Sequence, residues 1–349
     1  MKDWEPHDLL TPDPAQRTSG TRRPAAGHLT RPAGREPAGR LVLISVLGWV
    51  VCFAVGVTLQ RRLRDPHAAS HLIFTLVLWV MSPLVVVYAY TTVVIRLELV
   101  AAFGCLVAAT WITLAVGMLW GRLAGRGSRE AGVMAFATAM GNCGTLGFPL
   151  TTLAFGGQGL ALAVIYAEFQ YLIPTDGVML GLGRHYAGPN SKGARAPGLR
   201  KLVRSWLLNP PVIAGAAAVA LRLAGADLTP YVSPIGPFVG LLFGLVGFLQ
   251  IGLAISLEPL AHDRSELWRA AVTIALRCGL LATVLFTLGL VTGVPIPGVF
   301  FLLAMMPVAF NTLVVSAVFD LDRELARLLV AVSTPLVIAA VLIWQLAAR

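Results

Sequence analysis

Apolar residues occur in long runs separated by short polar segments from about residue 41 to the end of the chain. A helix needs about 20 such residues to cross a hydrocarbon core of roughly 30 Å, and the runs lack the period-two alternation of barrel strands. The pattern therefore predicts ten transmembrane helices. They run near 41–60, 72–95, 99–121, 131–155, 160–183, 207–225, 232–257, 268–291, 297–319 and 325–347.

A polar stretch at 184–206 divides the ten spans into five and five. Because five is odd, two related halves would enter the membrane in opposite senses, as in the inverted repeats of many secondary transporters. The predicted fold class is therefore an all-α polytopic membrane protein built from two inverted five-helix repeats. The predicted parts are a disordered basic arm at 1–40, a first repeat at 41–183, a cytoplasmic loop at 184–206 and a second repeat at 207–349.

Composition agrees with a membrane protein, since 57% of the residues are hydrophobic and only 13% are charged, against about 25% charged in a soluble domain. The net charge of +10 comes from basic residues in the short loops and in the arm. Without an aromatic-interleaved basic patch on a soluble domain, no nucleic-acid partner is predicted. The four cysteines show no metal-ligand spacing and are expected to be small buried side chains.

Most loop Lys and Arg residues fall between spans one and two, three and four, five and six, seven and eight, and nine and ten. Positive loops stay in the cytoplasm, so both termini are predicted to lie outside. The basic residues of the arm would favour a cytoplasmic N-terminus, but we follow the larger number of basic residues in the loops. Arginine far outnumbers lysine, which favours a GC-rich bacterial genome. We therefore expect a multi-pass protein of the bacterial cytoplasmic membrane, in contact with lipid.

The predicted fourth span contains the sequence GNCGTLGFPL at 141–150, which opposes a regular helix. Pro149 removes a backbone donor and clashes with the preceding turn, and glycines such as Gly144 and Gly147 permit unusual backbone angles. Asn142 places a polar side chain beside them. The segment predicts two half-helices that meet within the membrane.

The predicted ninth span carries a similar interruption at Pro307, followed one helical turn later by Asn311. A helix that begins after a break presents free N–H groups and a partial positive charge, which suit an anion. Asn142 and Asn311 add both donors and acceptors. Small residues and prolines also pack or kink membrane helices without any ligand, so this alternative stays open for either break alone. Two breaks in corresponding spans favour a binding site.

Four other polar residues inside the predicted spans are candidates for function. Glu168 and Asp176 in span five are candidates for carrying a proton or binding a cation such as sodium, or for bonding within the bundle. Gln250 is expected to line a pathway or to bond a neighbouring helix. Arg277 needs a partner, which Glu168 or a wet cavity would provide.

The chain lacks the H-E-x-x-H, G-x-S-x-G and Walker A motifs and any DNA-binding signature. Catalytic and metal-ligating residues are therefore not predicted, and the protein is not expected to be an enzyme. No cofactor is predicted beyond a coupling ion.

The ordered series FATAMGNCGTLGFPLTTLAFGGQGLALAVIYAEFQ (136–170), LLNPPVIAGAAAVAL (207–221), LQIGLAISLEPL (249–260) and AMMPVAFNTLVVSAVFDLD with LLVAVSTPL (304–336) resembles the auxin efflux carrier (AEC) family over about 41–347. The resemblance implies ten helices in two inverted repeats, with the fourth and ninth spans crossing at their prolines. It also implies an elevator-like carrier of a small organic anion such as a carboxylate, and it leaves a homodimer open. By resemblance, the substrate site would include Asn142 and Pro149 of the fourth span and Pro307 and Asn311 of the ninth.

Two departures from the family pattern qualify this interpretation. Cys143 and Thr145 stand where other small or apolar residues are common, and the second span lacks an acid, which puts ion coupling through such a residue in doubt. Two other functions remain. One is a sodium-coupled symporter of the related bile-acid type, and the other is a membrane sensor that keeps the carrier fold without turnover.

Overall fold

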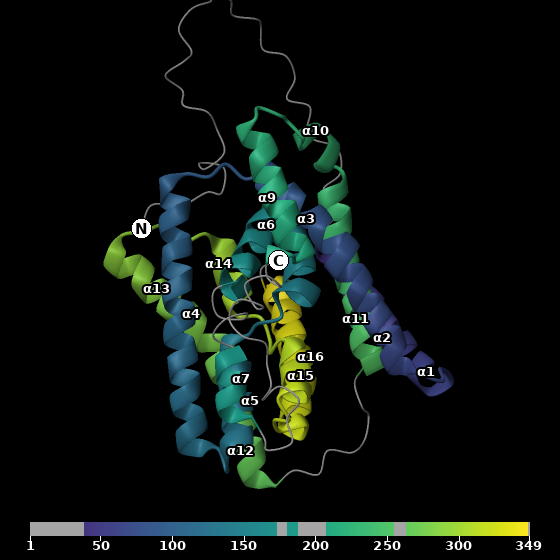
Figure 1. Cartoon of the computed structure of the whole chain (residues 1–349), viewed down its shortest axis with the longest axis vertical. Helices are drawn as coiled ribbons and strands as arrows, with labels where there is room; N and C mark the ends of the chain where they lie inside the picture. Colours follow the sequence, from purple (N-terminus) through teal and green to yellow (C-terminus); the bar gives the residue numbers. More distant parts are fainter. Residues whose placement is uncertain (1–37, 173–179, 188–206, 255–262, 348–349) are drawn as a thin grey trace, which may run out of the picture.

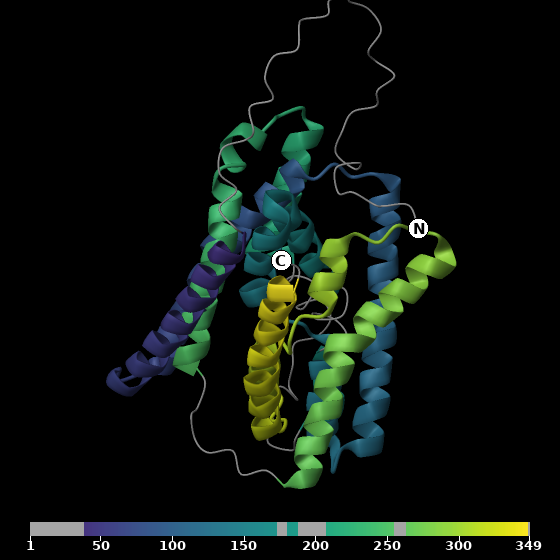
Figure 2. The same ribbon diagram turned by 180° about the vertical axis from the view of Figure 1, so that it is seen from behind.

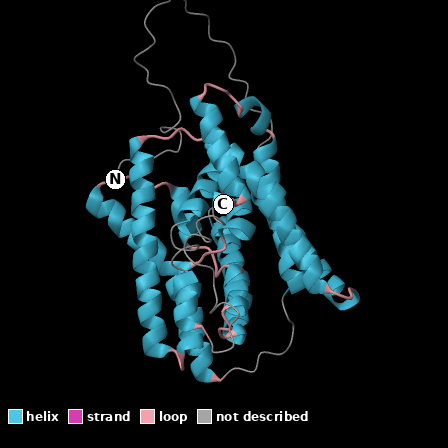
Figure 3. Cartoon of the chain, viewed as in Figure 1, coloured by secondary structure: helices cyan, strands magenta, loops and turns pink. Residues whose placement is uncertain are grey.

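The computed structural model describes residues 38–172, 180–187, 207–254 and 263–347, which form helices joined by short connections (Figures 1 and 3). Among these residues, seven helices are long and apolar enough to cross a membrane by their length and composition. The all-α prediction is confirmed, and the seven helices fit a polytopic membrane protein. The predicted arm, except its last three residues, and most of the predicted loop at 184–206 lie outside the described residues.

The first part of the chain forms long uninterrupted helices. They are α1 (Ala38–Arg62), the continuous series α2 (Pro66–Leu76), η3 (Val77–Met81) and α3 (Ser82–Thr92), and α4 (Leu97–Ala124). The five residues of η3 form a π-helical turn directly before α3, whose second residue is Pro83. Proline has no N–H to continue the regular hydrogen-bond series, and a wider turn is a common local adjustment in such a helix.

A second set of helices follows the predicted cytoplasmic loop. They are α9 (Pro210–Leu223), α10 (Thr229–Val232), α11 (Ile235–Ala254), and the continuous series α12 (Arg264–Ala275), η7 (Leu276–Leu280) and α13 (Leu281–Thr292). Among the described residues, α9 is apolar but shorter than the seven long helices. The element η7 is a second π-helical turn, and it carries Arg277.

Two regions are broken, and both lie where the sequence predicted interruptions. The first consists of α5 (Ser128–Ala139), an extended segment at 140–142, η4 (Cys143–Gly147) and α6 (Phe148–Leu172), with the short α7 (Leu180–Tyr186) beyond it. Gly156 inside α6 has a φ of 67°, so this helix is two pieces joined at a kink. The second consists of α14 (Gly298–Ala304), an irregular segment at 305–310 and α15 (Asn311–Val318), followed by α16 (Arg323–Ala347).

The helices form two groups with α6 between them. On one side α1 lies along α11, and α3 packs on α9; on the other α4 lies along α5 and α13, and α12 contacts α16. Helix α6 contacts α11 and α3 from the first group and α4 and α14 from the second. Figures 1 and 2 show α1 and α11 at one flank and α4 and α13 at the other. The interrupted segments lie in the interior between these flanks.

Glycines allow the closest helix contacts in the first group. A Cβ placed on Gly56 of α1 would overlap the carbonyl oxygen of Leu249 and lie 2.9 Å from the Cα of Gly252 on α11. Close backbone approach through small residues is how membrane helices gain packing energy without a hydrophobic driving force. The α1–α11 contact is therefore set by residues that lack side chains.

Candidate functional site: the paired helix interruptions

The two interruptions lie against each other and pair as a short antiparallel bridge at Gly141 and Val308. The amide of Asn142 donates a hydrogen bond to the carbonyl of Pro307 at 2.8 Å, and the amide of Ala309 donates to the carbonyl of Met140 at 3.0 Å. An unpaired backbone group inside a membrane protein is costly. Each break thus supplies part of the hydrogen bonding that the other has lost.

The first interruption is shaped by Asn142. Its side-chain Oδ1 accepts a hydrogen bond from the amide of Thr145 at 3.2 Å and so caps η4. Its carbonyl accepts from the amide of Gly147 at 3.1 Å, which closes the π-helical turn η4. Pro149 then begins the next turn without needing a donor partner. Sequence and local structure agree here, because an N-cap residue precedes a helix start.

The second interruption is held by α16. The amide of Val308 donates to the hydroxyl of Ser333 at 3.1 Å, and both residues are buried. Ser333 lies two residues before Pro335, which sits inside α16. A serine hydroxyl therefore provides a partner to an amide that neither a helix nor the facing segment satisfies.

Arg277 joins the ends of two broken helices. Its side chain is fully buried, and its guanidinium donates only to main-chain carbonyls among its described partners. Nε donates to Met306 at 3.0 Å and Nη2 to Ala304 at 3.1 Å, at the end of α14. Nη1 lies 3.4 Å from the carbonyls of Thr138 and Ala139, at the end of α5. A cation is favourable there, because the last carbonyls of a helix carry partial negative charge.

Gly141 makes room for this guanidinium. A Cβ at residue 141 would overlap Nη2 of Arg277 and stand 2.8 Å from its Cζ. Any other residue would displace the arginine or the bridge. The first glycine of the GNCGTLGFPL segment is thus required by a side chain from α12–α13, which the sequence pattern did not reveal.

Two buried donor groups at the starts of the second half-helices have no partner among the described residues. They are the side-chain nitrogen of Asn142, in a residue only 4% exposed, and the hydroxyl of Thr312 on α15, in a residue that is fully buried. A buried polar group without a partner costs about 1–3 kcal/mol. Gly144 lies beside Asn142, and no described atom lies within 4 Å of the place where its Cβ would stand. The combination of open space and unpaired donors suits a ligand with acceptor atoms.

The other predicted residues of the interruptions occupy distinct places. Gly147 packs against Leu303 of α14, with a Cβ contact that would be 2.7 Å. Pro149 is buried beside Gly244 of α11. Asn311 is the first residue of α15 and is exposed in the isolated chain. The structure thus buries Asn142 but leaves its predicted counterpart accessible.

Of the remaining predicted polar residues, Glu168 and Gln250 lie on helices α6 and α11, and one lies outside the described region. Glu168 is half-buried on α6, and Gln250 is half-buried on α11. Asp176 falls in 173–179, outside the described residues. Arg277 binds carbonyls, so neither partner that the sequence offered for it, Glu168 or a wet cavity, is needed.

A thiol and an amide form a contact that the sequence analysis missed. Cys143 donates through Sγ to Oε1 of Gln170 at 3.0 Å, and Nε2 of Gln170 reaches the carbonyl of Ala139 at 3.4 Å. Gln170 is 2% exposed. It therefore connects the end of α5 with the start of η4 across the break. The only available signal was a glutamine two residues after Glu168 in an otherwise apolar predicted span.

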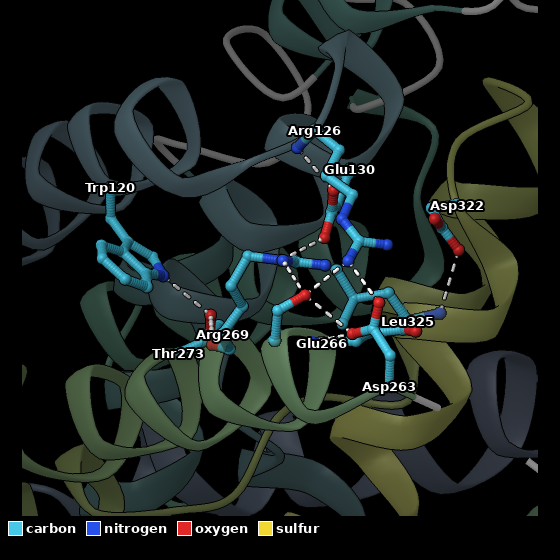
Figure 4. A network of polar contacts seen from close by, with 10 residues as sticks. Trp120, Arg126, Glu130, Asp263, Glu266, Arg269, Thr273, Asp322 and Leu325 are labelled. Carbon is cyan, nitrogen blue, oxygen red and sulfur yellow. Dashed lines mark hydrogen bonds and ion pairs between the residues drawn. The ribbon is translucent and has the colours of Figure 1, made fainter. Parts of the chain in front are cut away.

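A polar network holds the first turns of α12 against the turn between α4 and α5 (Figure 4). The buried side chains of Glu130 on α5 and Arg269 on α12 form an ion pair at 2.7 Å. The backbone amide of Arg126 donates to the same glutamate at 2.6 Å, and its guanidinium contacts Asp263 and Ser265. These contacts fix the helix that carries Arg277 to the turn between α4 and α5.

The charge of Asp263 is strongly favoured in this network. Hydrogen bonds from Arg126, from the hydroxyl of Ser265 and from the amide of Glu266 lower the pKa of its carboxyl well below the ordinary value. The same contact with Asp263 raises the pKa of Arg126. Both side chains are more than half exposed, so solvent screens the pair. The buried pair Glu130–Arg269 is the more important anchor.

Comparison with known proteins finds a relative that is named as a transporter. No family model matches the chain. A protein of Methanothermobacter thermautotrophicus, named an uncharacterized transporter, is 27% identical over 246 residues, which cover 69% of this chain and 76% of the relative. The chain is thus similar, over about two thirds of its length, to a protein named as a transporter.

Proposed function

We propose that the protein is a secondary carrier that moves a small organic anion, such as a carboxylate, across the membrane by alternating access. The observation that carries the proposal is the bridge between the two interruptions, flanked by the unpartnered donors of Asn142 and Thr312. The relative named as a transporter supports the same class of function. Because that class performs no chemical conversion, we propose no catalytic residue.

Electrostatics at the bridge favours an anion. The helices η4–α6 and α15 begin beside it, and helix starts carry partial positive charge. The opposite, negative ends belong to α5 and α14 and are occupied by the guanidinium of Arg277. A carboxylate near Asn142 and Gly144 would meet donors and positive ends without a competing negative group from these helices. We therefore place the substrate at Asn142, Gly144 and Thr312, with Asn311 at the accessible start of α15.

We further propose the ten-span arrangement in two inverted repeats that the apolar pattern predicts, with membership of the AEC family and an elevator-like motion. Antiparallel pairing of the two breaks supports the inverted relation, because equivalent segments of inverted repeats run in opposite senses. The division of helices into two groups on either side of α6 would allow one group to move against the other. A proton or sodium ion, with Glu168 or Asp176 as its carrier, is the proposed source of coupling.

The proposed orientation places in the cytoplasm the end of the molecule that carries the polar network of Figure 4, at the turn between α4 and α5. Ser128 is exposed at this end, and Ala226 is exposed at the opposite end, between α9 and α10 (Figure 1). In a background without the four native cysteines, a cysteine at residue 226 should react with a membrane-impermeant maleimide added to whole cells. A cysteine at residue 128 should react only after the cells are permeabilised. The reverse labelling pattern would overturn the orientation.

A thermal-stability screen tests the proposed ligand class. Purified protein in detergent is heated with mono- and dicarboxylates and, as matched controls, with their neutral methyl esters. A ligand that binds only the folded state raises the apparent stability, so one or more acids should raise the unfolding midpoint and their esters should not. Equal stabilisation by acids and esters, or none by any acid, would contradict the proposal.

A further inference from the structure

We propose that the guanidinium of Arg277 is a built-in cation, which fills a carbonyl-lined cation position shared by the two interruptions. Removal of the side chain would leave a site that accepts a free guanidinium ion. The proposal deepens the proposed function, since it implies that anion transport needs no free metal cation at this position. Its main tests measure stability and are independent of transport.

The ligand set around Arg277 is that of a cation site. Four neutral main-chain oxygens, from Thr138, Ala139, Ala304 and Met306, converge on one guanidinium at 3.0–3.4 Å. Rings of backbone carbonyls are how proteins hold cations in dry surroundings. These oxygens come from both breaks, so whatever cation they bind also joins α5 to α14.

No described carboxylate bonds to this charge, and the side chain is fully buried. A buried charge of this kind is expensive unless the surrounding groups compensate for it. Here the carbonyls of the two helix ends provide the compensation. With this cation on the negative helix ends, the positive starts of η4 and α15 beside the bridge favour an anion. Arg277 is therefore a positioning residue that masks the negative helix ends.

Two local features of the backbone accommodate the Arg277 side chain. Residue 141 is a glycine, and a Cβ there would overlap Nη2. The arginine lies in the π-helical turn η7, a type of wide turn that often redirects a side chain at a functional position. Neither feature is needed by an arginine that faces lipid or solvent. Both indicate that the chain is adapted to place a guanidinium at the bridge.

Chemical rescue is the first test. Arg277→Ala is purified in detergent, and its unfolding midpoint is measured with millimolar guanidinium chloride and with equal tetramethylammonium chloride, whose bulky cation donates no hydrogen bonds. Guanidinium should raise the midpoint by a few degrees, because the vacated carbonyl site exists only in the folded state, and tetramethylammonium should not. The control is Arg222→Ala, which removes an exposed arginine that donates to the carbonyls of Tyr90 and Val93. Rescue of both variants, or of neither, would overturn the proposal.

A second pair of variants keeps the test valid if the alanine variant does not fold. Arg277→Lys keeps the charge but loses the planar set of donors of the guanidinium. Arg277→Met keeps a side chain of similar length but loses the charge. The lysine variant should be recovered in larger amount and unfold at a higher temperature than the methionine variant. If the two variants are equally unstable, or if methionine is the better one, the charge has no role and the proposal fails.

A double-variant test of the contact between Arg277 and Gly141 completes the set. Gly141→Ala should lower the unfolding midpoint strongly in the wild-type chain but little in Arg277→Ala, because the group that it overlaps is then gone. Additive losses would contradict the contact. In proteoliposomes, anion uptake measured in sodium and in choline salts tests the proposed function separately, because a coupling ion at Glu168 or Asp176 is distinct from the cation position at Arg277. If uptake is absent in both salts but guanidinium rescues Arg277→Ala, the proposed function fails while the cation site stands.

Discussion

At the residue scale, Asn142 has two separable roles. Its Oδ1 caps η4 through the amide of Thr145, whereas its side-chain nitrogen has no partner among the described residues. An aspartate would keep the capping oxygen, lose the donor and add a negative charge. Loss of the capping oxygen should therefore lower stability, and loss of the donor should weaken ligand binding.

We predict that Asn142→Asp lowers the unfolding midpoint less than Asn142→Ala, which loses a cap of about 1 kcal/mol. Both variants should lose the stabilisation that carboxylates give to the wild-type protein. The measurement is thermal unfolding of the purified protein with and without the carboxylate identified in the screen. An aspartate variant that still responds to the carboxylate would show that residue 142 only shapes the break.

Residues differed in how far the sequence could predict them. Asn142, Pro149 and Pro307 were predicted because helix-breaking or polar residues stand out in an apolar run, and the structure places each at a break. The partners of Arg277 could not be predicted. They are main-chain carbonyls, which every residue possesses, and they come from helices far apart in the chain. The hydroxyl of Ser333 was missed because a single serine in a membrane helix gives no distinctive pattern.

At the element scale, the interruptions were predictable but their pairing was not predictable from composition alone. Proline and glycine mark where a helix stops, and so the ends of α5 and α14 follow from the sequence. The bridge between Gly141 and Val308 depends on how two distant elements meet. Only the resemblance to the AEC family implied that the broken spans would cross. Helices α1 and α4 extend a few residues beyond their apolar runs into polar ends, whereas α9 is shorter than its run and α6 continues across the boundary predicted between the fourth and fifth spans.

The close contact between α1 and α11 gives a prediction at this scale. Gly56→Ala should lower the unfolding midpoint, since the added methyl overlaps the backbone of α11. Gly104→Ala in α4 is the matched control, because no described atom lies within 4 Å of its Cβ position. There, the better helix propensity of alanine, about 1 kcal/mol, should leave the midpoint unchanged or raise it. Equal effects of the two substitutions in thermal unfolding would contradict the packing described for α1.

At the scale of the whole molecule, the polar network of Figure 4 ties the loop between α4 and α5 to the start of α12. The network predicts a pH dependence. Because the pKa of Asp263 is lowered in the folded protein, its charge contributes stability that is present above the unfolded pKa of about 3.9. That contribution is lost as the pH falls toward the folded value.

Asp263→Asn isolates this charge, since asparagine keeps an oxygen to cap the amide of Glu266. The wild-type protein should unfold at a higher temperature than the variant, by a constant margin from pH 7 to about pH 5 and by a smaller margin below about pH 4. Differential scanning fluorimetry across this range measures the margin. A margin that grows on acidification would have the wrong sign for a lowered carboxyl pKa.

The overall plan was predictable in part. Long apolar runs and few charges suffice to predict a helical membrane protein, because crossing a bilayer dictates the length and composition of each helix. The arrangement of the two helix groups around α6 was not predictable. It depends on glycine contacts such as that between Gly56 and α11, and on polar contacts such as that between Glu130 and Arg269.

The central claim is that the paired interruptions bind and move an organic anion. The most direct test is uptake of labelled mono- and dicarboxylates into proteoliposomes that contain the wild-type protein, Asn142→Asp or Gly104→Ala. The account predicts saturable uptake of at least one carboxylate by the wild-type and Gly104→Ala proteins, and near-background uptake by Asn142→Asp at equal protein content. Uptake by Asn142→Asp at the wild-type rate would contradict the claim, as would wild-type uptake no greater than that of empty liposomes for every acid.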